Sequence, residues 1–557
     1  MTADDAARDL DDLTTAFWDH YLESNPTEAH LLGIYRYAGF VEDSSRAAED
    51  RTIETMRTFA SDAEAIDPGG LDDQQRLSRE LLVHHADDTA AVLGVRLPEL
   101  GADPIFGPQE ELPIVLGMLG LPDAGVAEAM ADKLHGFGRQ VDQLTERLRE
   151  GVASGRTPAA FAVTDTVGQI DDWLARPINE DPLLAAVPAP PATLDEAAWR
   201  ERLGQVVADV VRPAFAAYAD VLRTEVLPHA RPDEECGLGA LPDGEASYAT
   251  MLRHSTTTDL TAQQIHDIGL EQVAKLAEEY RALGPDVVGS DDLGTIFERL
   301  RTDPALHYER GEELVSDSVV AMDRAWAAMP DWFETLPQAR CEVQGTDGGA
   351  KAFYFPPASD GSRGGTFFIN TEEPESWGRF ELESMAFHEG IPGHHLQLTI
   401  AGELSGLPDF RKHLHHNAYA EGWGLYTERL ADEMGLYAGP VDRIGMLAAD
   451  SMRACRLVVD TGLHALGWSR QQAVDYMVDN SPLTPAMVRP EIDRYICSPG
   501  QATGYMVGRL EILRMRAEAQ GRQGAGFDVR RFHSAVLDSG SLPLDVLDRV
   551  VAARLPA

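Results

Sequence analysis

Apolar side chains recur at helical spacing along most of the chain. Residues 8–23 carry Leu10, Leu13 and Phe17 three or four positions apart, and Asn25-Pro26 ends the run. Further helices are predicted over residues 124–150, 195–227 and 261–283, the last opened by cap signals at Thr256–Thr258 and Asp259. We therefore expect a mostly α protein.

The pattern changes between about residues 340 and 371. Three short segments there, 341–344, 352–355 and 365–370, are rich in β-branched and aromatic residues, and Pro and Gly separate them. They predict a small antiparallel β-sheet set inside the helical protein. Helix resumes at Glu381 and continues to His388. Because the strands come just before this histidine helix, they could offer a strand edge to a substrate; the alternative is a purely structural ribbon.

Composition and charge narrow the classes of function. The 557 residues are 44% hydrophobic and 25% charged, which suits a globular protein with a core large enough to enclose a site. Lys plus Arg total 47 and Asp plus Glu total 92, a formal charge of -45 that repels phosphate backbones and anionic lipid. We therefore expect neither a nucleic-acid nor a membrane partner.

Targeting signals and cysteines bear on where the protein is located in the cell. The N-terminus lacks a basic start followed by an apolar run, and no stretch of about 18 apolar residues occurs. Four well-separated cysteines favour neither disulfides nor a cysteine-type zinc site. We expect a cytoplasmic protein with an N-terminal helical region over 1–255 and a catalytic region over 256–557, joined as one continuous unit.

The chemistry concentrates in the segment His388-Glu389-Gly390-Ile391-Pro392-Gly393-His394-His395. Catalytic zinc takes three protein ligands, commonly imidazoles and a carboxylate, and keeps a further position for water. The usual helical arrangement is H-E-x-x-H, with two histidines one turn apart and the glutamate as general base. Here the second histidine comes later, after a Pro-Gly pair.

The longer spacing needs a distorted helix. On an ideal helix the residue six positions on lies about 240° round, and the seventh lies about 10.5 Å along the axis. Pro392 lacks an N–H and Gly393 allows unusual dihedrals, so a bulge or kink could bring the second histidine to the metal. The spacing does not choose between His394 and His395. The alternative is a helix break with surface histidines.

A second helix offers the third ligand. Residues 418–430 read as a helix that contains Glu421, and a glutamate from a second helix completes zinc sites of this kind. Glu428 is a fallback ligand, although with Arg429 it reads as a solvated face. These residues predict one Zn²⁺ per chain, with Glu389 positioned to act as general base.

The two segments resemble the bacterial family catalogued as domain of unknown function 885. Further matching pieces are residues 25–29, 240–244, 256–260, 354–370, 460–464 and 494–505. That family is similar in architecture to helical zinc peptidases of the thimet oligopeptidase and carboxypeptidase Taq kind. The resemblance implies a large helical body with a deep cleft and a small sheet beside the zinc helix. It implies His388, His394 and Glu421 as ligands, and it favours His394 over His395.

Other polar residues are candidates for roles around the metal. The related helical peptidases use a late phenol as oxyanion donor, so Tyr505 is a candidate catalytic residue, with Tyr495 as the weaker choice. His464, one turn after Asp460, could be a donor or a partner of a metal ligand. The residues that we assign to substrate binding are Asn370, Arg494, Tyr495 and Gln501. The tyrosines, Arg494 and His464 each have a structural alternative, such as an internal ion pair or hydrogen bond.

The leading hypothesis is a zinc metallopeptidase acting on short peptides. A zinc amidohydrolase that cleaves an amide in a small metabolite would use the same ligands. A non-catalytic, metal-stabilised binding protein is the third reading, and a base beside a ligand histidine argues against it.

Overall fold

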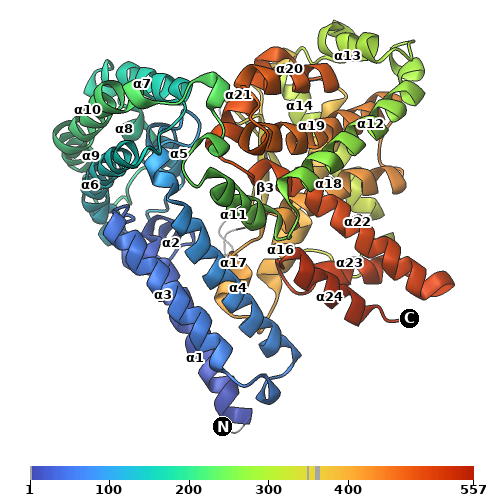
Figure 1. Cartoon of the computed structure of the whole chain (residues 1–557), viewed down its shortest axis with the longest axis horizontal. Helices are drawn as coiled ribbons and strands as arrows, with labels where there is room; N and C mark the ends of the chain where they lie inside the picture. Colours follow the sequence, from blue (N-terminus) through green and yellow to red (C-terminus); the bar gives the residue numbers. More distant parts are fainter. Residues whose placement is uncertain (1–2, 348–349, 358–363) are drawn as a thin grey trace. The chain divides into compact units, whose positions relative to one another are not determined.

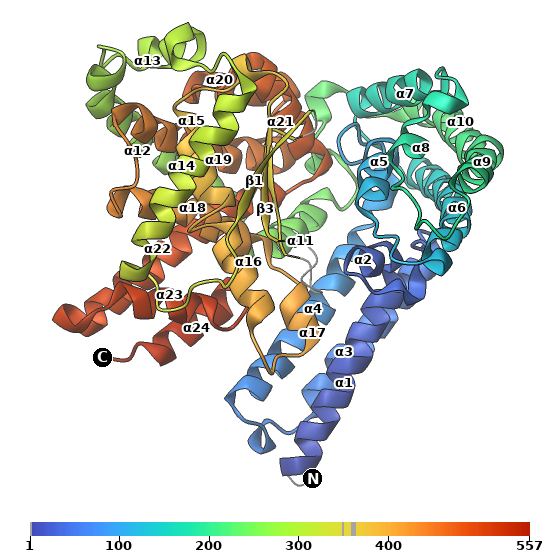
Figure 2. The same cartoon turned by 180° about the vertical axis from the view of Figure 1, so that it is seen from behind.

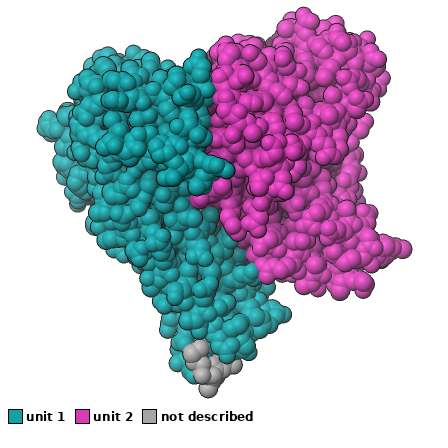
Figure 3. Space-filling view, viewed as in Figure 1, with its two compact units in different colours: residues 1–247 teal, residues 248–557 magenta. Residues whose placement is uncertain are grey.

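The computed structural model describes residues 3–347, 350–357 and 364–557. These residues form two compact units, 1–247 and 248–557, shown in Figure 3. Helices dominate both units, which confirms the predicted fold class. The sequence-based division between residues 255 and 256 falls at the end of the helix that crosses from one unit into the next, α11 (Gly244–Thr256).

Unit 1 is helical throughout its described part. Long helices α1, α3 and α4 lie side by side (Figures 1 and 2), and α6 packs against α9 and α10 around a core that contains Phe137, Trp199 and Phe215. Its helices are α1 (Ala3–Ser24), α2 (Pro26–Leu31), α3 (Arg46–Ala65), α4 (Asp73–Val95), α5 (Pro108–Met118), α6 (Ala124–Ser154), α7 (Ala160–Leu174), α8 (Pro182–Ala186), α9 (Glu196–Val206) and α10 (Arg212–Val221).

Unit 2 surrounds the buried helix α19. Helix α12 packs along α19, and α18 packs along α22. The helices are α12 (Ala262–Val287), α13 (Leu293–Thr302), α14 (Gly311–Ala328), α15 (Glu381–Glu389), α16 (His394–Glu403), α17 (Asp409–His413), α18 (Asn417–Glu433), α19 (Pro440–Ala465), α20 (Arg470–Asn480), α21 (Pro485–Cys497), α22 (Gly504–Gln523), α23 (Val529–Leu537) and α24 (Leu544–Arg554).

The helices expected from periodicity are present. Helix α1 covers residues 8–23, α6 covers 124–150 and α12 covers 261–283 apart from its first residue. That residue, Thr261, is the N-cap, and it exchanges hydrogen bonds with Gln264 in a capping box. Residues 195–227 are helical but irregular, because π-turns over 207–211 and 222–226 interrupt them.

The small sheet has three strands, β1 (Glu342–Thr346), β2 (Ala352–Phe355) and β3 (Thr366–Asn370). β3 is central; it pairs antiparallel with β2 and parallel with β1. The three predicted segments are therefore strands, but the prediction of a wholly antiparallel sheet was wrong. Side-chain alternation shows which face of a strand is buried and does not reveal its direction. The sheet lies beside the histidine helices, since β2 contacts both α15 and α16.

Within the described residues, no helix combines the length and the apolar character that crossing a membrane requires.

Candidate metal centre

The histidine segment is a break between two helices. Helix α15 ends at Glu389 and α16 begins at His394, so the expected bulge or kink is a complete interruption. Gly393 makes the return possible, because a Cβ atom there would lie 1.9 Å from the carbonyl oxygen of His388. The turn places the His394 ring beside the His388 ring, with 4.8 Å between centroids.

Glu421 of α18 reaches the same point. Its Oε2 lies 3.5 Å from Nε2 of His388 and 3.4 Å from Nε2 of His394. Ligands about 2.1 Å from a tetrahedral zinc stand about 3.4 Å from one another, which is close to both spacings. One ligand atom from each of the three residues lies within 4.8 Å of the others. The structure thus brings together the three residues predicted as ligands.

Glycines let the second helix approach. A Cβ atom at Gly424 would lie 2.7 Å from Cε1 of His388. On another face of α18, a Cβ atom at Gly422 would lie 2.5 Å from the Cα atom of Gly508 on α22. Larger residues at these positions would push α18 away from α15 and α22, so the glycines set the distance at which Glu421 meets His388.

Glu428 fixes the orientation of His388. Its Oε1 lies 2.8 Å from Nδ1 of His388, and its Oε2 accepts a hydrogen bond of 2.5 Å from Ser384. With Nδ1–H donated to this carboxylate, Nε2 keeps its lone pair for a metal. Glu428 is 1% exposed, so the reading of Glu428-Arg429 as a solvated face was wrong. Arg429 instead pairs with Glu279 and Asp450.

The centre has an excess of acidic groups. Burial alone would lower the pKa of His388, but hydrogen bonds to Glu421 and Glu428 raise it to about 9. Burial would raise the pKa of Glu421, yet His388 and His394 hold it well below the usual range. The carboxylates therefore attract positive charge to this buried point, which a bound cation would supply.

The neighbouring histidine has other partners. Nδ1 of His395 lies 2.9 Å from the hydroxyl of Tyr354, and its Nε2 lies 3.0 Å from the carbonyl oxygen of Ala339. Both ring nitrogens are thus engaged, and His395 links the sheet to α16. The geometry favours His394 as the second ligand.

Glu389 lies at the end of α15, directly after His388. Its side chain is half-buried, and it makes no hydrogen bond or ion pair within the described part of the chain. It is close enough for its charge to raise the pKa of His388. Glu389 is therefore a carboxylate free to accept a proton beside the ligand cluster.

The two candidate tyrosines differ in whether their hydroxyl groups already have hydrogen-bond partners. The ring of Tyr505, in the first turn of α22, lies nearly parallel to that of His388 with 6.5 Å between centroids. Its hydroxyl makes no hydrogen bond within residues 3–347, 350–357 and 364–557. Tyr495 is fully buried, and its hydroxyl bonds to Glu491 and Arg456. Tyr505 is the phenol available to the site.

The remaining candidates take part in internal hydrogen bonds. Arg494 donates to Gln501 and pairs with Glu491, and Gln501 donates to Asn417. His464 bonds to the carbonyl of Tyr495 at 2.9 Å. On the last strand of the sheet, the side-chain oxygen of Asn370 accepts from the backbone N–H two residues on. For Arg494, Tyr495 and His464 these contacts correspond to the structural alternatives, and Gln501 and Asn370 also make internal hydrogen bonds.

Two arginines close to the centre, Arg453 and Arg456 of α19, were not predicted from the sequence. Glu428 was predicted as a fallback ligand or a surface residue, and its contact with Nδ1 of His388 was not foreseen. Arg453 lies 3.8 Å from the Glu428 carboxylate, and the guanidinium of Arg456 lies 4.5 Å from the Tyr505 ring centroid. A charged residue that recurs on an otherwise buried helix was the signal that could have identified the arginines.

The fold and the site define a class: an α-helical protein with a His-His-Glu cluster at the junction of three helices. The chain belongs to the family described as "Bacterial protein of unknown function (DUF885)", which it matches over residues 26–551. A comparison with curated proteins gives no match.

Two solved structures share this fold. One is described as "the putative lipoprotein from Colwellia psychrerythraea"; it is 27% identical, with a TM-score of 0.91 and 99% of both chains covered. The other is "a putative lipoprotein of unknown function from Shewanella oneidensis"; it is 18% identical, with a TM-score of 0.75 and 96% of this chain and 98% of that chain covered. The second likeness concerns the fold alone.

Proposed function

We propose that the protein is a zinc-dependent hydrolase that cleaves amide bonds in short peptides. The observation that carries this proposal is the convergence of His388, His394 and Glu421 with the unpaired carboxylate of Glu389 beside them. Two imidazoles and one carboxylate are a ligand set of catalytic zinc sites, which leave a further position open. A purely structural site would need no free base.

The chain's own residues supply the proton transfers. Zinc held by the three ligands would polarise the scissile carbonyl and make water more acidic. Glu389 would take a proton from the attacking water and deliver it to the amine nitrogen as the C–N bond breaks. Tyr505 would donate a hydrogen bond to the carbonyl oxygen as negative charge develops there. Glu428 would hold His388 in the tautomer that presents Nε2.

The test uses the full chain loaded with zinc and incubated with a mixture of short peptides, with cleavage followed by mass spectrometry. We expect hydrolysis by the wild type, loss of it after chelation and recovery when zinc is returned. Glu389→Gln is the matched control, because it should keep the metal and lose turnover. A protein that binds zinc and cleaves no peptide, yet hydrolyses a small amide, would favour the metabolite amidohydrolase. One that binds zinc and cleaves neither would favour the binding protein.

The cellular location belongs to the same proposal. The strong acidic charge supports a soluble cytoplasmic enzyme, whereas the two solved relatives carry the word lipoprotein in their descriptions. Fractionation of cells that make the native protein would separate the two, since a lipid-anchored chain would sediment with membranes.

A further inference from the structure

Arg453 of α19 is a buried cation with few partners. Its side chain is 7% exposed, its Nε has no hydrogen-bond partner, and its Nη1 makes one long bond of 3.3 Å to the carbonyl of Ala449. The closest carboxylate oxygen, Oε1 of Glu428, lies 3.8 Å from Nη2, beyond hydrogen-bond distance. Most of its five N–H donors are therefore unused within the described residues.

Arg456 lies one helical turn further along the same helix. It is 5% exposed, and it donates through Nε to Tyr495 and through Nη2 to Glu491. Its Nη1 has no partner within the described ranges. Two neighbouring guanidinium groups on one face of α19 thus retain unused donors, and leaving buried charged donors unpaired is costly.

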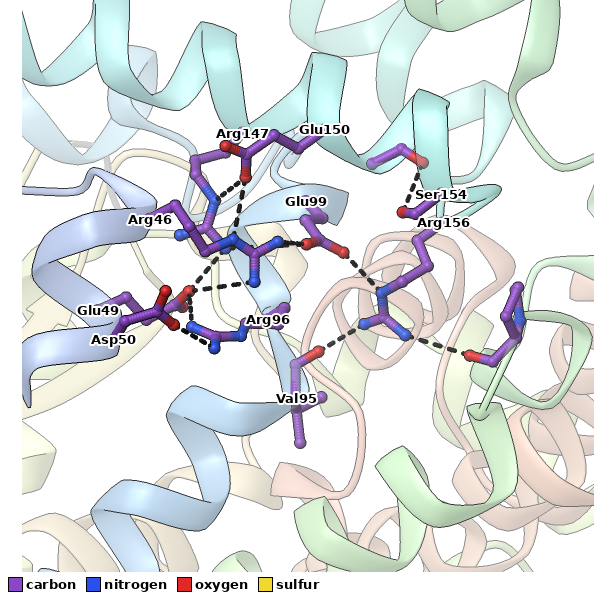
Figure 4. Close-up of polar contacts among 12 residues, drawn as sticks. Arg46, Glu49, Asp50, Val95, Arg96, Glu99, Arg147, Glu150, Ser154 and Arg156 are labelled. Atoms are coloured by element: carbon purple, nitrogen blue, oxygen red, sulfur yellow. Dashed lines mark hydrogen bonds and ion pairs between the residues drawn. The ribbon is translucent and has the colours of Figure 1, made fainter. Parts of the chain in front are cut away.

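A cluster of arginines in unit 1 shows how this protein surrounds a buried guanidinium with carboxylates. In unit 1, Arg147 is 1% exposed and lies 2.7 Å from Glu49 and 3.1 Å from Glu150. Figure 4 shows this cluster, in which Arg46, Arg96 and Arg156 also face acidic side chains. Arg453, by contrast, has a single carboxylate nearby, that of Glu428 at 3.8 Å.

Two separate chains of contacts connect the arginines to the metal centre. The Tyr505 ring, which stacks on His388, lies 5.9 Å from the guanidinium carbon of Arg453 and 4.5 Å from that of Arg456. In the second chain of contacts, Oε1 of Glu428 lies 3.8 Å from Arg453 and 2.8 Å from His388. Arg453 is therefore no farther from His388 than about two residues of extended peptide.

Three arginines lie around Tyr505, and the carboxylates near them have other partners. The negative charge of Glu421 and the positive charges of Arg453, Arg456 and Arg494 act on its phenol. Arg456 and Arg494 share one carboxylate, Glu491. Glu428, the acidic group closest to Arg453, is engaged by His388 and Ser384. At least one cation beside the centre therefore lacks an acidic partner of its own, and an anionic ligand would provide one.

We propose that Arg453, assisted by Arg456, binds a carboxylate of the substrate that lies one or two residues beyond the cleaved bond. Arginine recognises carboxylates through paired N–H donors, which makes it the suitable residue for this role. The inference rests on the proposed function and deepens it. This carboxylate is either the C-terminus of a peptide or an acidic side chain. If it is the C-terminus, the enzyme would release one or two residues from the C-terminal end of its substrate.

Binding of two hydroxamates to the zinc-loaded full chain tests the carboxylate site without turnover. Succinic monohydroxamate carries a free carboxylate, and its carboxamide counterpart is neutral but has the same metal-binding group. We expect calorimetry to show at least about tenfold tighter binding of the carboxylate compound, since one charge-assisted hydrogen bond contributes about 1.5–3 kcal/mol. Arg453→Met should remove this preference and leave the affinity for the carboxamide unchanged.

Controls keep the outcomes separate. Arg443→Met alters an arginine of the same helix that is 50% exposed and paired with Asp432, and it should keep the preference. If Arg453→Met does not fold, Arg453→Lys replaces it and should reduce the preference, because an ammonium lacks the planar fork. Equal binding of both compounds to the wild type would overturn the carboxylate site alone. Binding of neither would overturn the proposed metal centre, and this inference with it.

Three peptides that share one sequence apart from the final residue identify the source of the carboxylate. One has a free C-terminus, one is amidated, and one is amidated with Glu as its final residue. Preferential cleavage of the first, with release of one or two residues, supports the C-terminal carboxylate. Preferential cleavage of the third supports an acidic side chain. Cleavage of the neutral amidated peptide as fast as the others would overturn the inference.

Discussion

Glu421 and Glu428, two turns apart on α18, approach the same imidazole from opposite sides. Glu421 lies 3.5 Å from Nε2 of His388, and Glu428 lies 2.8 Å from Nδ1. Residues at this spacing share one face of a helix, so α18 carries both a candidate ligand and the group that orients another. The position of one helix therefore sets two contacts of the site.

Removing the charge of Glu428 should weaken metal binding. Glu428→Gln keeps the shape of the side chain but loses the carboxylate that holds the His388 tautomer, and such partners typically contribute about 10–100-fold in metal affinity. Competition with a chromophoric chelator would measure the effect. Glu433→Gln, on the same helix and with a side chain 44% exposed, is the control and should leave affinity unchanged. Equal affinity in both variants would show that Glu428 has no orienting role.

Metal content should distinguish the neighbouring histidines. We expect about one zinc per wild-type chain, largely lost in His388→Ala, His394→Ala and Glu421→Ala. His395→Ala should retain zinc, because both nitrogens of His395 bond to Tyr354 and Ala339. Elemental analysis of folded protein, with circular dichroism as the check on folding, gives the result. Zinc lost in His395→Ala and kept in His394→Ala would reverse the assignment.

Glu389 should affect turnover and not metal binding. Glu389→Gln removes the proton acceptor without removing a ligand, so zinc content should stay near that of the wild type. Peptide hydrolysis should fall by about 10²–10⁴-fold, the usual contribution of one proton-transfer group. Measured turnover near the wild-type rate would contradict the base role.

The two tyrosines should differ in kinetics. Tyr505→Phe should lower kcat by about 10²–10³-fold with KM nearly unchanged, if its phenol donates only to the developing oxyanion. Tyr495→Phe should affect stability more than kcat, because its hydroxyl bonds to Glu491 and Arg456 inside the protein. Steady-state kinetics and melting temperatures of both variants decide. A Tyr505→Phe enzyme with intact kcat and a lower melting temperature would show a structural tyrosine.

Acid should destabilise the fold partly through His533. Burial lowers the pKa of this fully buried histidine from 6.5 to about 3, and the ring bonds to Tyr426 and the carbonyl of Trp332. The unfolded chain binds the proton more tightly, so the stabilisation is present above pH 6.5 and is lost as pH falls towards 3. The slope from this one group is at most about 1.4 kcal/mol per pH unit.

Urea unfolding at pH 7 and pH 5 measures that slope. His533→Gln should show a smaller loss of stability between the two pH values than the wild type. His229→Gln, an exposed histidine of unit 1, should behave like the wild type. An unchanged slope in His533→Gln would exclude His533 as a source of the acid sensitivity.

Local patterns predicted most of the secondary structure and the residues that meet at the centre. Periodicity located α1, α6 and α12, and the Pro-Gly pair marked the point where α15 ends. Residue types alone indicated that His388 and Glu421 could meet. These features depend on neighbours in sequence, which the chain displays directly.

Features that depend on distant partners were not predictable. Residue spacing could not choose between His394 and His395, because Tyr354 and Ala339, which contact the His395 ring, are distant in sequence; only the family resemblance favoured His394. Glu428 resembles a surface residue because an arginine follows it, although the two side chains have different partners. The parallel pairing of β1 with β3 likewise depends on a tertiary arrangement that no local pattern records.

The contact of Gly422 with Gly508 also bears on motion. Glu421 precedes the first glycine, and Tyr505 lies one turn before the second, so the two helix backbones meet beside both residues. Sliding either helix along the other would drive backbone atoms of Ala418 and Gly508 into collision, whereas long side chains at a crossing could change rotamer and yield. Thermal fluctuations should therefore displace the carboxylate and the phenol together, and the spacing between them should vary less than the position of either.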